Sequence, residues 1–377
     1  MIYLDNSATT GFKPKNVKLA LNEALNHYNV NPGRGGYKAS MKCADMIFSV
    51  REKIKNFFNA EEPENVVFTP GCTFSLNYVI KGILDKNDHC IVSDMEHNAV
   101  MRPLYKTGCC FDTAEIDFSD ALKTADNFEK LIKPNTKLII CTAASNVFGV
   151  MPPIDKIGAI CRKHGILFAV DAAQAAGVYP IDMKKANIDF LCAAGHKGLY
   201  APMGIGILIA EKEIGKTTVE GGTGTFSEMI EQPKIMPEMF ESGTLNIPGI
   251  TGLGAGIDFV KQIGIEKIYG YEMKLIKKIN REFSDNEKII LYTKPSGTVN
   301  YCPVMSFNIT GKLSEETESV LNSNNIAVRS GLHCAPFAHK KMNTLDIGTV
   351  RVSPSVFTKE SDIDYFLSVI RKTIKKI

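Results

Sequence analysis

A histidine and a lysine stand side by side in a run of small and apolar residues, CAAGHKGLYAPMGIG at 192–206. An apolar stretch, NIDFLCAA, leads into the pair, and a glycine-rich turn leads out of it. A lysine is rarely buried unless its charge is paired or its amine does chemistry. His196 and Lys197 are therefore candidates for a functional site.

A carboxylate and an amide follow an earlier apolar run, in AVDAAQAAG at 169–177. Asp171 ends the run, and Gln174 comes three residues later. An ionised carboxylate at such a position needs a cationic partner, and a protonated ring nitrogen is one. A helix-capping role for Asp171 is the alternative.

The stretch TPGCT at 69–73 lies between a strand-like run and a helix-like run. Gly71 allows a ligand to approach the backbone, and the amides that follow, with the Thr73 hydroxyl, point toward an anion at a helix N-terminus. The lysine of a nucleotide-binding GK[ST] motif is missing, which argues against nucleoside triphosphates. A capped helix after a turn is the alternative.

Two further polar residues complete a recognisable set. His97 can lie flat on an aromatic ligand, and Asn146 can donate to a ring oxygen, although either residue can also be a polar loop residue. An anion cup, a carboxylate for a pyridinium nitrogen, a stacking histidine and a buried lysine together indicate a pyridoxal phosphate site. In such a site the lysine forms a Schiff base, and the carboxylate keeps the ring protonated as an electron sink.

The elements that position these residues are predicted within 64–210. Apolar runs rich in Ile, Val, Leu and Phe alternate there with helix-like stretches, which is typical of a parallel sheet covered on both faces in a doubly wound α/β domain. Five runs end in polar residues, at Thr69–Thr73, Glu96–Asn98, Ser145–Asn146, Asp171–Gln174 and His196–Lys197. Functional groups of such sheets gather beyond the carboxyl ends of the strands, so we expect these five ends to meet.

The pattern changes after residue 250. A long amphipathic helix-like stretch, 266–283, is followed by mixed strand-like and helix-like runs. We predict a large α/β domain over 15–250 and a smaller α+β domain over 251–377. The opening segment, 1–14, is expected to join the two or to run over the site.

Composition is that of an ordinary globular protein. The 377 residues are 44% hydrophobic and 23% charged, and the net charge of +3 gives no reason to expect nucleic acid or an anionic membrane as a partner. We expect no signal peptide and no membrane-spanning segment. The ten cysteines are irregularly spaced without a C-x-x-C pair, so we expect no metal site but reduced thiols in a cytoplasmic protein.

From these motifs the chain resembles the cysteine desulfurases, within the class V aminotransferases of the fold-type I pyridoxal phosphate enzymes. The resemblance covers nearly the whole length, in order and spacing. Its blocks are YLDNSATT, TPGCTFSLN, EHN, SNVFG, VDAAQAAG, GHKGLYAPMGIG, FESGTLNIPG and VRSGLHCAP. It implies a mostly parallel seven-stranded-type sheet between helices and a smaller α+β C-terminal domain.

The resemblance also implies roles for individual residues. Lys197 is the Schiff-base lysine and the base that moves the substrate α-proton. Arg351, in TVRVSP, is the arginine that clamps the substrate carboxylate, with a strand surface charge as the alternative. The implied cofactor contacts are Gly71, Cys72, Thr73 and His196 at the phosphate, Asp171 at the ring nitrogen, His97 on the ring face, Gln174 and Asn146 at the phenolic oxygen, and Thr244 at the phosphate of the partner subunit in a homodimer. Asn146 is also implied to face the substrate.

A cysteine distinguishes desulfurases within the superfamily. Cys334, in VRSGLHCAP, matches the nucleophile that takes the substrate sulfur as a persulfide, and an inert loop thiol is the alternative. His333 and Arg329 are expected to favour its thiolate, and Arg329 is also placed among the substrate-binding residues. Lys197, Cys334 and His97 are thus the predicted catalytic residues.

The sequence departs from the family at three places. Ala194 stands where desulfurases usually have Ser or Thr at the phosphate, Leu332 replaces a common His, and the segment after Cys334 is short. The implied reaction converts L-cysteine to L-alanine and a Cys334 persulfide, which a thiol acceptor protein then receives. A selenocysteine lyase, another class V lyase or aminotransferase, and a non-catalytic sulfur-carrier scaffold remain alternatives.

Overall fold

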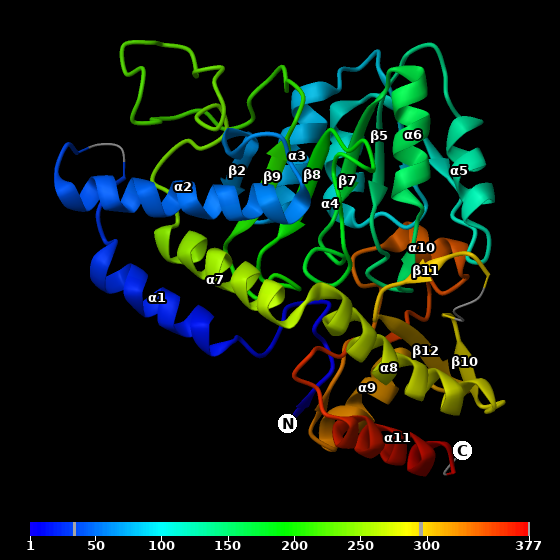
Figure 1. The fold of residues 1–377 in the computed structure, drawn as a ribbon. Coiled ribbons are helices and arrows are strands. Elements are labelled where there is room, and N and C mark those ends of the chain that lie inside the picture. The colour runs from blue at the N-terminus through cyan, green and yellow to red at the C-terminus, as the bar shows by residue number, and fades with distance from the viewer. Residues whose placement is uncertain (33–34, 294–296, 376–377) are drawn as a thin grey trace.

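The computed structural model describes residues 1–32, 35–293 and 297–375, and its central feature is a seven-stranded sheet (Figure 1). All its strands run in one direction except β9, which is antiparallel to both neighbours. The strand order is β2 (Val66–Thr69), β9 (Gly206–Ala210), β8 (Phe190–Ala194), β7 (Leu167–Asp171), β5 (Thr136–Thr142), β3 (His89–Ser93) and β4 (Cys110–Ala114). The predicted α/β class with a mostly parallel sheet is confirmed, although strands β4 and β9 were not predicted.

Helices cover both faces of this sheet. Successive residues of a strand point to opposite faces, so in β3 Cys90 and Val92 pack on one side and Ile91 on the other. Helices α3 (Cys72–Ile83) and α4 (Asn98–Thr107) contribute to the first cluster. The opposite cluster receives α2 (Lys38–Phe58), α5 (Ala121–Glu129), α6 (Ile154–His164) and α7 (Ile247–Ile263).

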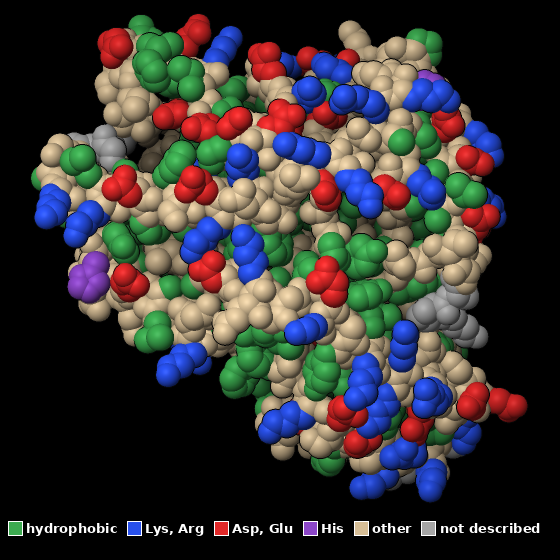
Figure 2. Space-filling view, in the orientation of Figure 1, with side chains coloured by type: hydrophobic (Ala, Val, Ile, Leu, Met, Phe, Trp, Pro, Cys, Tyr) green, Lys and Arg blue, Asp and Glu red, His purple; other side chains and the backbone are tan. Residues whose placement is uncertain are grey.

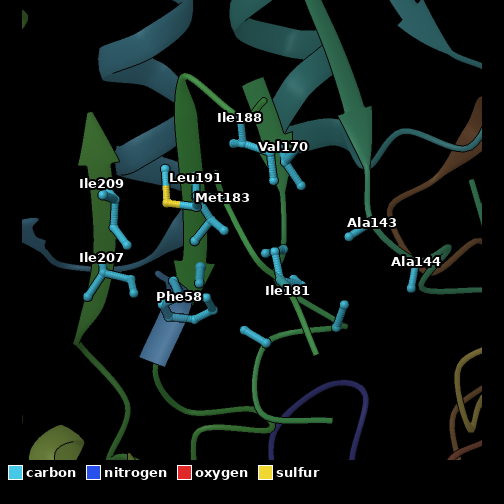
Figure 3. Close-up of a cluster of buried hydrophobic side chains, with 14 of the residues drawn as sticks. Phe58, Ala143, Ala144, Val170, Ile181, Met183, Ile188, Leu191, Ile207 and Ile209 are labelled. Carbon is cyan, nitrogen blue, oxygen red and sulfur yellow. The ribbon is translucent and has the colours of Figure 1, made fainter. Parts of the chain in front are cut away.

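The larger of these two clusters, on the face covered by α2, α5, α6 and α7, includes side chains from β7, β8 and β9. Figure 3 shows Phe58, at the end of α2, with Met183, Leu191, Ile207 and Ile209 around it. These side chains are almost completely buried, and burying one large apolar side chain contributes about 1.5–3 kcal/mol. This packing fixes the strands whose carboxyl ends lead into the loops described below.

A second, smaller body of structure lies below the large sheet in the view of Figure 1. Its antiparallel sheet has the order β10 (Ile289–Leu291), β12 (Met305–Ile309), β14 (Val350–Val352). Its separate hydrophobic cluster is built with α8 (Ile265–Ser284), α9 (Ser314–Ser323) and α11 (Glu360–Ile374). The predicted boundary at residue 250 falls within α7, and the division of the chain at that point stays a prediction.

The N-terminal segment connects the two bodies. Strand β1 (Ile2–Tyr3) pairs in parallel with β13 (Ile326–Ala327), and the Thr10 amide then donates to the His196 carbonyl at 3.1 Å. The remaining elements are α1 (Lys15–His27), the 3₁₀ turn η1 (Pro63–Asn65), α10 (Pro336–Lys341) and the paired short strands β6 (Val150–Met151) and β11 (Asn300–Tyr301). Among the described residues, no helix combines the length and the apolar character that crossing a membrane requires.

Candidate functional site

The five polar strand ends meet at one cavity of about 360 Å³. Strands β2, β3, β5, β7 and β8 run in the same direction, so their carboxyl ends share one edge of the sheet. Of the predicted site residues, Cys334 and Thr244 lie outside this cavity. Those that line it are Gly71, Cys72, Thr73, His97, Asn146, Asp171, Gln174, His196, Lys197, Arg329 and Arg351.

Lys197 lies on the cavity wall, in the turn after β8. Burial lowers the pKa of its amine, an effect that nearby Asp171 partly offsets. Withdrawal from water disfavours the charged ammonium, so the neutral nucleophilic amine becomes easier to reach. The turn therefore places the Lys197 amine at the cavity and not within the closed core.

Asp171 ends β7 and is 4% exposed. Its Oδ1 accepts hydrogen bonds from the Ala173 amide at 2.9 Å and from the Cys72 thiol at 3.4 Å. No hydrogen bond from the described residues reaches Oδ2, although Asp171 lines the cavity. A carboxylate oxygen that is unpaired at a cavity fits a cationic N–H donor brought by a ligand.

The predicted anion cup is formed at the start of α3. The helix begins at Cys72 directly after Gly71, and a methyl group added at Gly71 would meet no atom within 4 Å, so open space borders the backbone there. Across the cavity wall, His196 holds a buried Nδ1 without a hydrogen-bond partner among the described residues. Burial, with Lys197 and Lys13 nearby, lowers the pKa of His196 to about 4.

His97 caps the N-terminus of α4. Its Nδ1 accepts a hydrogen bond from the Ala99 amide at 2.9 Å, so the proton of the neutral ring is on Nε2. Burial lowers the pKa of His97, which keeps the imidazole neutral near pH 7. A neutral ring held by a helix cap suits stacking on an aromatic ligand.

The two amide side chains are oriented by backbone carbonyls. Gln174 Nε2 donates to the Ser7 carbonyl at 3.1 Å, and Asn146 Nδ2 donates to the His333 carbonyl at 2.7 Å. Each NH₂ group has a second hydrogen, so each can also donate to a ligand in the cavity. The Asn146 bond ties the end of β5 to the loop that carries Cys334.

Arg351 is 2% exposed and is paired with a residue of the N-terminal segment that the sequence reasoning did not select. Its Nη2 donates to Asp5 Oδ1 at 2.6 Å, and its Nη1 donates to the Asn146 carbonyl at 3.0 Å. Its Nε is buried without a partner among the described residues. Asp5 stands in the quoted YLDNSATT block, but nothing in the sequence indicated that it would meet residue 351.

Cys334 lies on the loop between β13 and α10, with its side chain exposed. Both His333 and Cys334 have positive φ, at 47° and 59°, a backbone region that non-glycine residues rarely occupy. The loop is held by its backbone, since the Asn98 amide donates to the Cys334 carbonyl at 2.7 Å. Cys334 lines a surface groove of about 380 Å³, which shares Thr73, His97 and Ala99 with the cavity.

One expectation for this loop is wrong. His333 does not supply a positive charge to the Cys334 thiolate, because burial lowers the pKa of His333 to about 2. Its Nε2 lies 3.0 Å from the Thr349 carbonyl and therefore carries the hydrogen of the neutral ring. Sequence adjacency suggested an electrostatic role, whereas the fold turns the imidazole inward.

The other predicted residues occupy different surroundings. Arg329 lines the cavity beside Arg351, whose amide donates to the Arg329 carbonyl at 2.8 Å. Thr244 is exposed, and its predicted contact to a partner subunit stays a prediction. Ala194, where a hydroxyl was expected, is part of the cavity lining.

Sequence reasoning missed two contributions to the site. Ser7 and Ala8 line the cavity, and the Cys72 thiol contacts the Asp171 carboxylate. The opening segment was expected to run over the site, but its individual contacts depend on pairing with residues more than 150 positions later, such as Gln174. No local pattern could have indicated them.

Known proteins resemble this chain over nearly its whole length. The family described as Aminotransferase class-V matches residues 2–366. A probable cysteine desulfurase of Pyrococcus abyssi is 34% identical over 100% of this chain and 95% of its own length, and a cysteine desulfurase of Wigglesworthia glossinidia brevipalpis is 31% identical over 100% and 93%. The apo structure of the cysteine desulfurase from Thermococcus onnurineus NA1 covers 100% of this chain and 95% of its own, with 31% identity and a TM-score of 0.89.

Proposed function

Since the chain belongs to the class-V aminotransferases and, among them, to the cysteine desulfurases, we propose that it uses pyridoxal phosphate to remove sulfur from L-cysteine. The products are L-alanine and a persulfide on Cys334. The observation that carries this proposal is the meeting of Lys197, Asp171 and His97 at one cavity whose wall continues into the groove of Cys334.

The groups around the cavity fit the cofactor. The unpartnered His196 Nδ1 and the open space at Gly71 suit its phosphate, together with Thr73. Asp171 Oδ2 suits the ring nitrogen, and His97 suits the ring face. Gln174 and Asn146 offer donors for the phenolic oxygen. When bound through Lys197, pyridoxal phosphate supplies an electron sink for the carbanion left by removal of the substrate α-proton.

Two residues of the chain then have separate roles, one in proton transfer and the other in binding the substrate carboxylate. Lys197, with its lowered pKa, accepts the substrate α-proton and can return it to carbon. Arg351 binds the substrate carboxylate, and its buried position makes that ion pair less exposed to screening by salt. Because Arg351 Nη2 already donates to Asp5, the substrate carboxylate must either share the guanidinium with the Asp5 carboxylate or displace it.

The sulfur step belongs to Cys334. Its thiolate attacks the sulfur of the bound substrate, so that an S–S bond forms while the C–S bond breaks. The electron pair of the broken bond stays on the substrate β-carbon, which takes up a proton and becomes the methyl group of alanine. A substrate side chain that extends past His97 reaches the groove of Cys334, because the two spaces share that residue.

Product analysis tests the proposal. The purified protein, supplied with pyridoxal phosphate, L-cysteine and dithiothreitol, is expected to release alanine and sulfide in equal amounts. Pyruvate in place of alanine would indicate a different lyase, and formation of glutamate from 2-oxoglutarate would indicate a transaminase. A protein that binds no pyridoxal phosphate would support the scaffold alternative.

Selenocysteine is the second candidate substrate. It is favoured by one observation, that Cys334 lines the outer groove and not the cavity itself, because a lyase that depends less on the loop cysteine tolerates this separation. Parallel turnover of L-cysteine and L-selenocysteine by the wild type and by Cys334→Ala separates the two. Retention of selenocysteine turnover alone in the variant would favour the lyase.

We propose further that the working form is a homodimer in the cytoplasm. Thr244 is exposed outside the cavity, which leaves it accessible to the cofactor of another copy of the chain. The same excursion, 215–245, exposes Val219, Phe226, Met229 and Ile230, and Figures 1 and 2 show it projecting from the molecule with apolar side chains on its surface. All ten cysteines are unpaired, which supports a reducing compartment. Light scattering of the purified protein measures the oligomeric state and tests the proposed homodimer.

A further inference from the structure

The groove beside Cys334 has a second wall that the desulfurase reaction does not use. Helices α3 and α4 lie side by side on one face of the large sheet, and their outer surfaces form this wall. Three exposed basic residues stand on it, Lys81 from α3 and Arg102 and Lys106 from α4. The groove therefore extends from the exposed thiol along two helices, away from the cavity.

The charge of this groove is entirely positive. None of its lining residues is an aspartate or a glutamate, and the complete lining is Thr73, Asn77, Lys81, His97, Asn98, Ala99, Arg102, Pro103, Lys106 and Cys334. Within the described ranges, the three cations form no ion pair and no side-chain hydrogen bond. Some surface lysines elsewhere are paired, as Lys133 is with Asp112 at 2.6 Å and Lys137 with Asp88 at 3.0 Å.

The spacing of the cations favours an extended ligand. Arg102 and Lys106 are four residues apart on α4, so they are one helical turn or about 6 Å apart along the axis. Lys81 adds a third charge from the neighbouring helix. A small anion meets only part of this arrangement, whereas a peptide segment with several carboxylates can meet all of it.

We propose that this groove, defined by Lys81, Arg102, Lys106 and Cys334, is the docking surface for an acidic segment of a thiol-bearing acceptor protein. The inference rests on the proposed function, because it concerns the persulfide that the reaction leaves on Cys334. The acceptor thiolate attacks the outer sulfur of that persulfide, a new S–S bond forms on the acceptor, and Cys334 leaves as a thiolate. No external oxidant or reductant is consumed.

The basic groove acts before this chemical step. Like-signed charges lining one channel attract an oppositely charged partner and raise its association rate, and the effect weakens as ionic strength rises. The groove also directs the bound segment toward the thiol, because Cys334 is part of the lining. Transfer is thus expected to discriminate acceptors by the charge around their thiol.

The test measures docking without turnover. Two peptides of equal length carry one Cys activated as a mixed disulfide with thionitrobenzoate, one peptide rich in Glu and the other with Gln at each Glu. Attack by Cys334 on the peptide sulfur releases coloured thionitrobenzoate. A Cys110→Ser background removes the other exposed thiol, and Cys334→Ala in that background gives the zero rate.

The variants isolate the charge of the groove. Lys81→Gln/Arg102→Gln/Lys106→Gln removes the three cations, and Lys261→Gln/Lys267→Gln/Lys277→Gln removes as many exposed, unpaired lysines from α7 and α8. In the protein with the unsubstituted groove, we expect Cys334 to release thionitrobenzoate roughly tenfold or more faster from the acidic peptide than from the neutral peptide at low salt. The groove variant is expected to lose this preference, and the control variant to keep it.

Two results overturn the proposal. One is an unchanged preference for the acidic peptide in the groove variant. The other is an equal loss of rate with both peptides, because that indicates a less reactive thiol and not lost docking. Alanine formation from L-cysteine with dithiothreitol, a neutral acceptor, is measured on the same proteins. If the wild type forms no alanine, the proposed function fails independently of the peptide result.

Discussion

The two predicted nucleophiles lie in contrasting parts of the molecule. Lys197 follows a central strand of the large sheet, faces a cavity and is surrounded by residues from four other strand ends. Cys334 lies on an exposed loop, held mainly through backbone carbonyls, with two consecutive residues at positive φ. The lysine is positioned by the core, whereas the thiol is positioned by local contacts at the surface.

The difference corresponds to what each residue has to reach. In the proposed reaction Lys197 acts on one small ligand inside the chain, and exclusion of water helps it by lowering the pKa of its amine. In the same proposal Cys334 meets the substrate on one side and a separate acceptor on the other. Its position where the cavity joins the groove gives it access to both spaces.

The largest expected effect is on the cavity side. In the proposed mechanism Lys197 would provide both the covalent attachment of the cofactor and the base for the α-proton, so Lys197→Ala is expected to lower alanine formation by about 10³-fold or more. The visible absorbance of the internal imine is expected to disappear with it. Retention of that absorbance would show that another amine binds the cofactor.

Cys334→Ser tests the other side of the comparison. Sulfur transfer from L-cysteine is expected to fall by about 10²-fold or more, because a hydroxyl does not replace a thiolate as the sulfur acceptor. The cofactor absorbance and its change on adding L-cysteine are expected to stay as in the wild type. A parallel loss of cofactor binding would contradict the separation of the two regions.

A smaller effect is expected at the ion pair between Asp5 and Arg351. Asp5→Asn leaves the buried guanidinium without its counter-charge, so it attracts the substrate carboxylate more strongly and KM for L-cysteine is expected to fall severalfold. Unfolding is expected at a lower temperature, since removing one partner of a buried pair costs about 3–5 kcal/mol.

Arg351→Lys is the matched comparison for Asp5→Asn. It retains the charge but loses the bidentate geometry, and KM is expected to rise by about tenfold with a smaller change in kcat. Steady-state kinetics with L-cysteine distinguishes the two substitutions. If Asp5→Asn also raises KM, Asp5 orients the arginine and does not compete with the substrate.

The prediction with the least expected effect on turnover concerns the pH dependence of stability. Glu96 is fully buried beside His97, and burial raises its pKa to about 8. The unfolded chain therefore loses this proton at lower pH than the folded chain does, so stability is expected to fall as pH rises from about 4.5 to 8, with a slope of up to about 1.4 kcal/mol per pH unit.

Glu96→Gln is expected to remove that slope, which urea unfolding between pH 5 and pH 8 measures. Glu272 is the matched control, because it is also buried, far along the chain in α8, with a pKa raised to about 8. Glu272→Gln is expected to remove a similar slope without changing the spectrum of the bound cofactor. An unaltered slope in Glu96→Gln would mean that Glu96 is ionised in the folded protein.

Much of the cavity side could be predicted from sequence. Apolar runs with polar ends predict parallel strands, and parallel strands bring their carboxyl ends to one edge, so the meeting of Asp171, His97 and Lys197 follows from local patterns and one topological rule. The motif order then identified the family before any contact was known. These residues are encoded within a few positions of the strands that carry them.

Only the tertiary structure decided the rest, for a physical reason that Asp5, Arg351 and His333 share. Asp5 meets Arg351 across nearly the whole chain, and the imidazole of His333 turns inward although its sequence neighbour is exposed. Likewise, Lys81 and Arg102 come from different helices, and only the packing of those helices joins them to Cys334 in one groove. Sequence determines which groups are available and on which strand end or helix they stand, whereas ion pairs, the direction of burial and shared grooves arise between distant segments once the chain has packed.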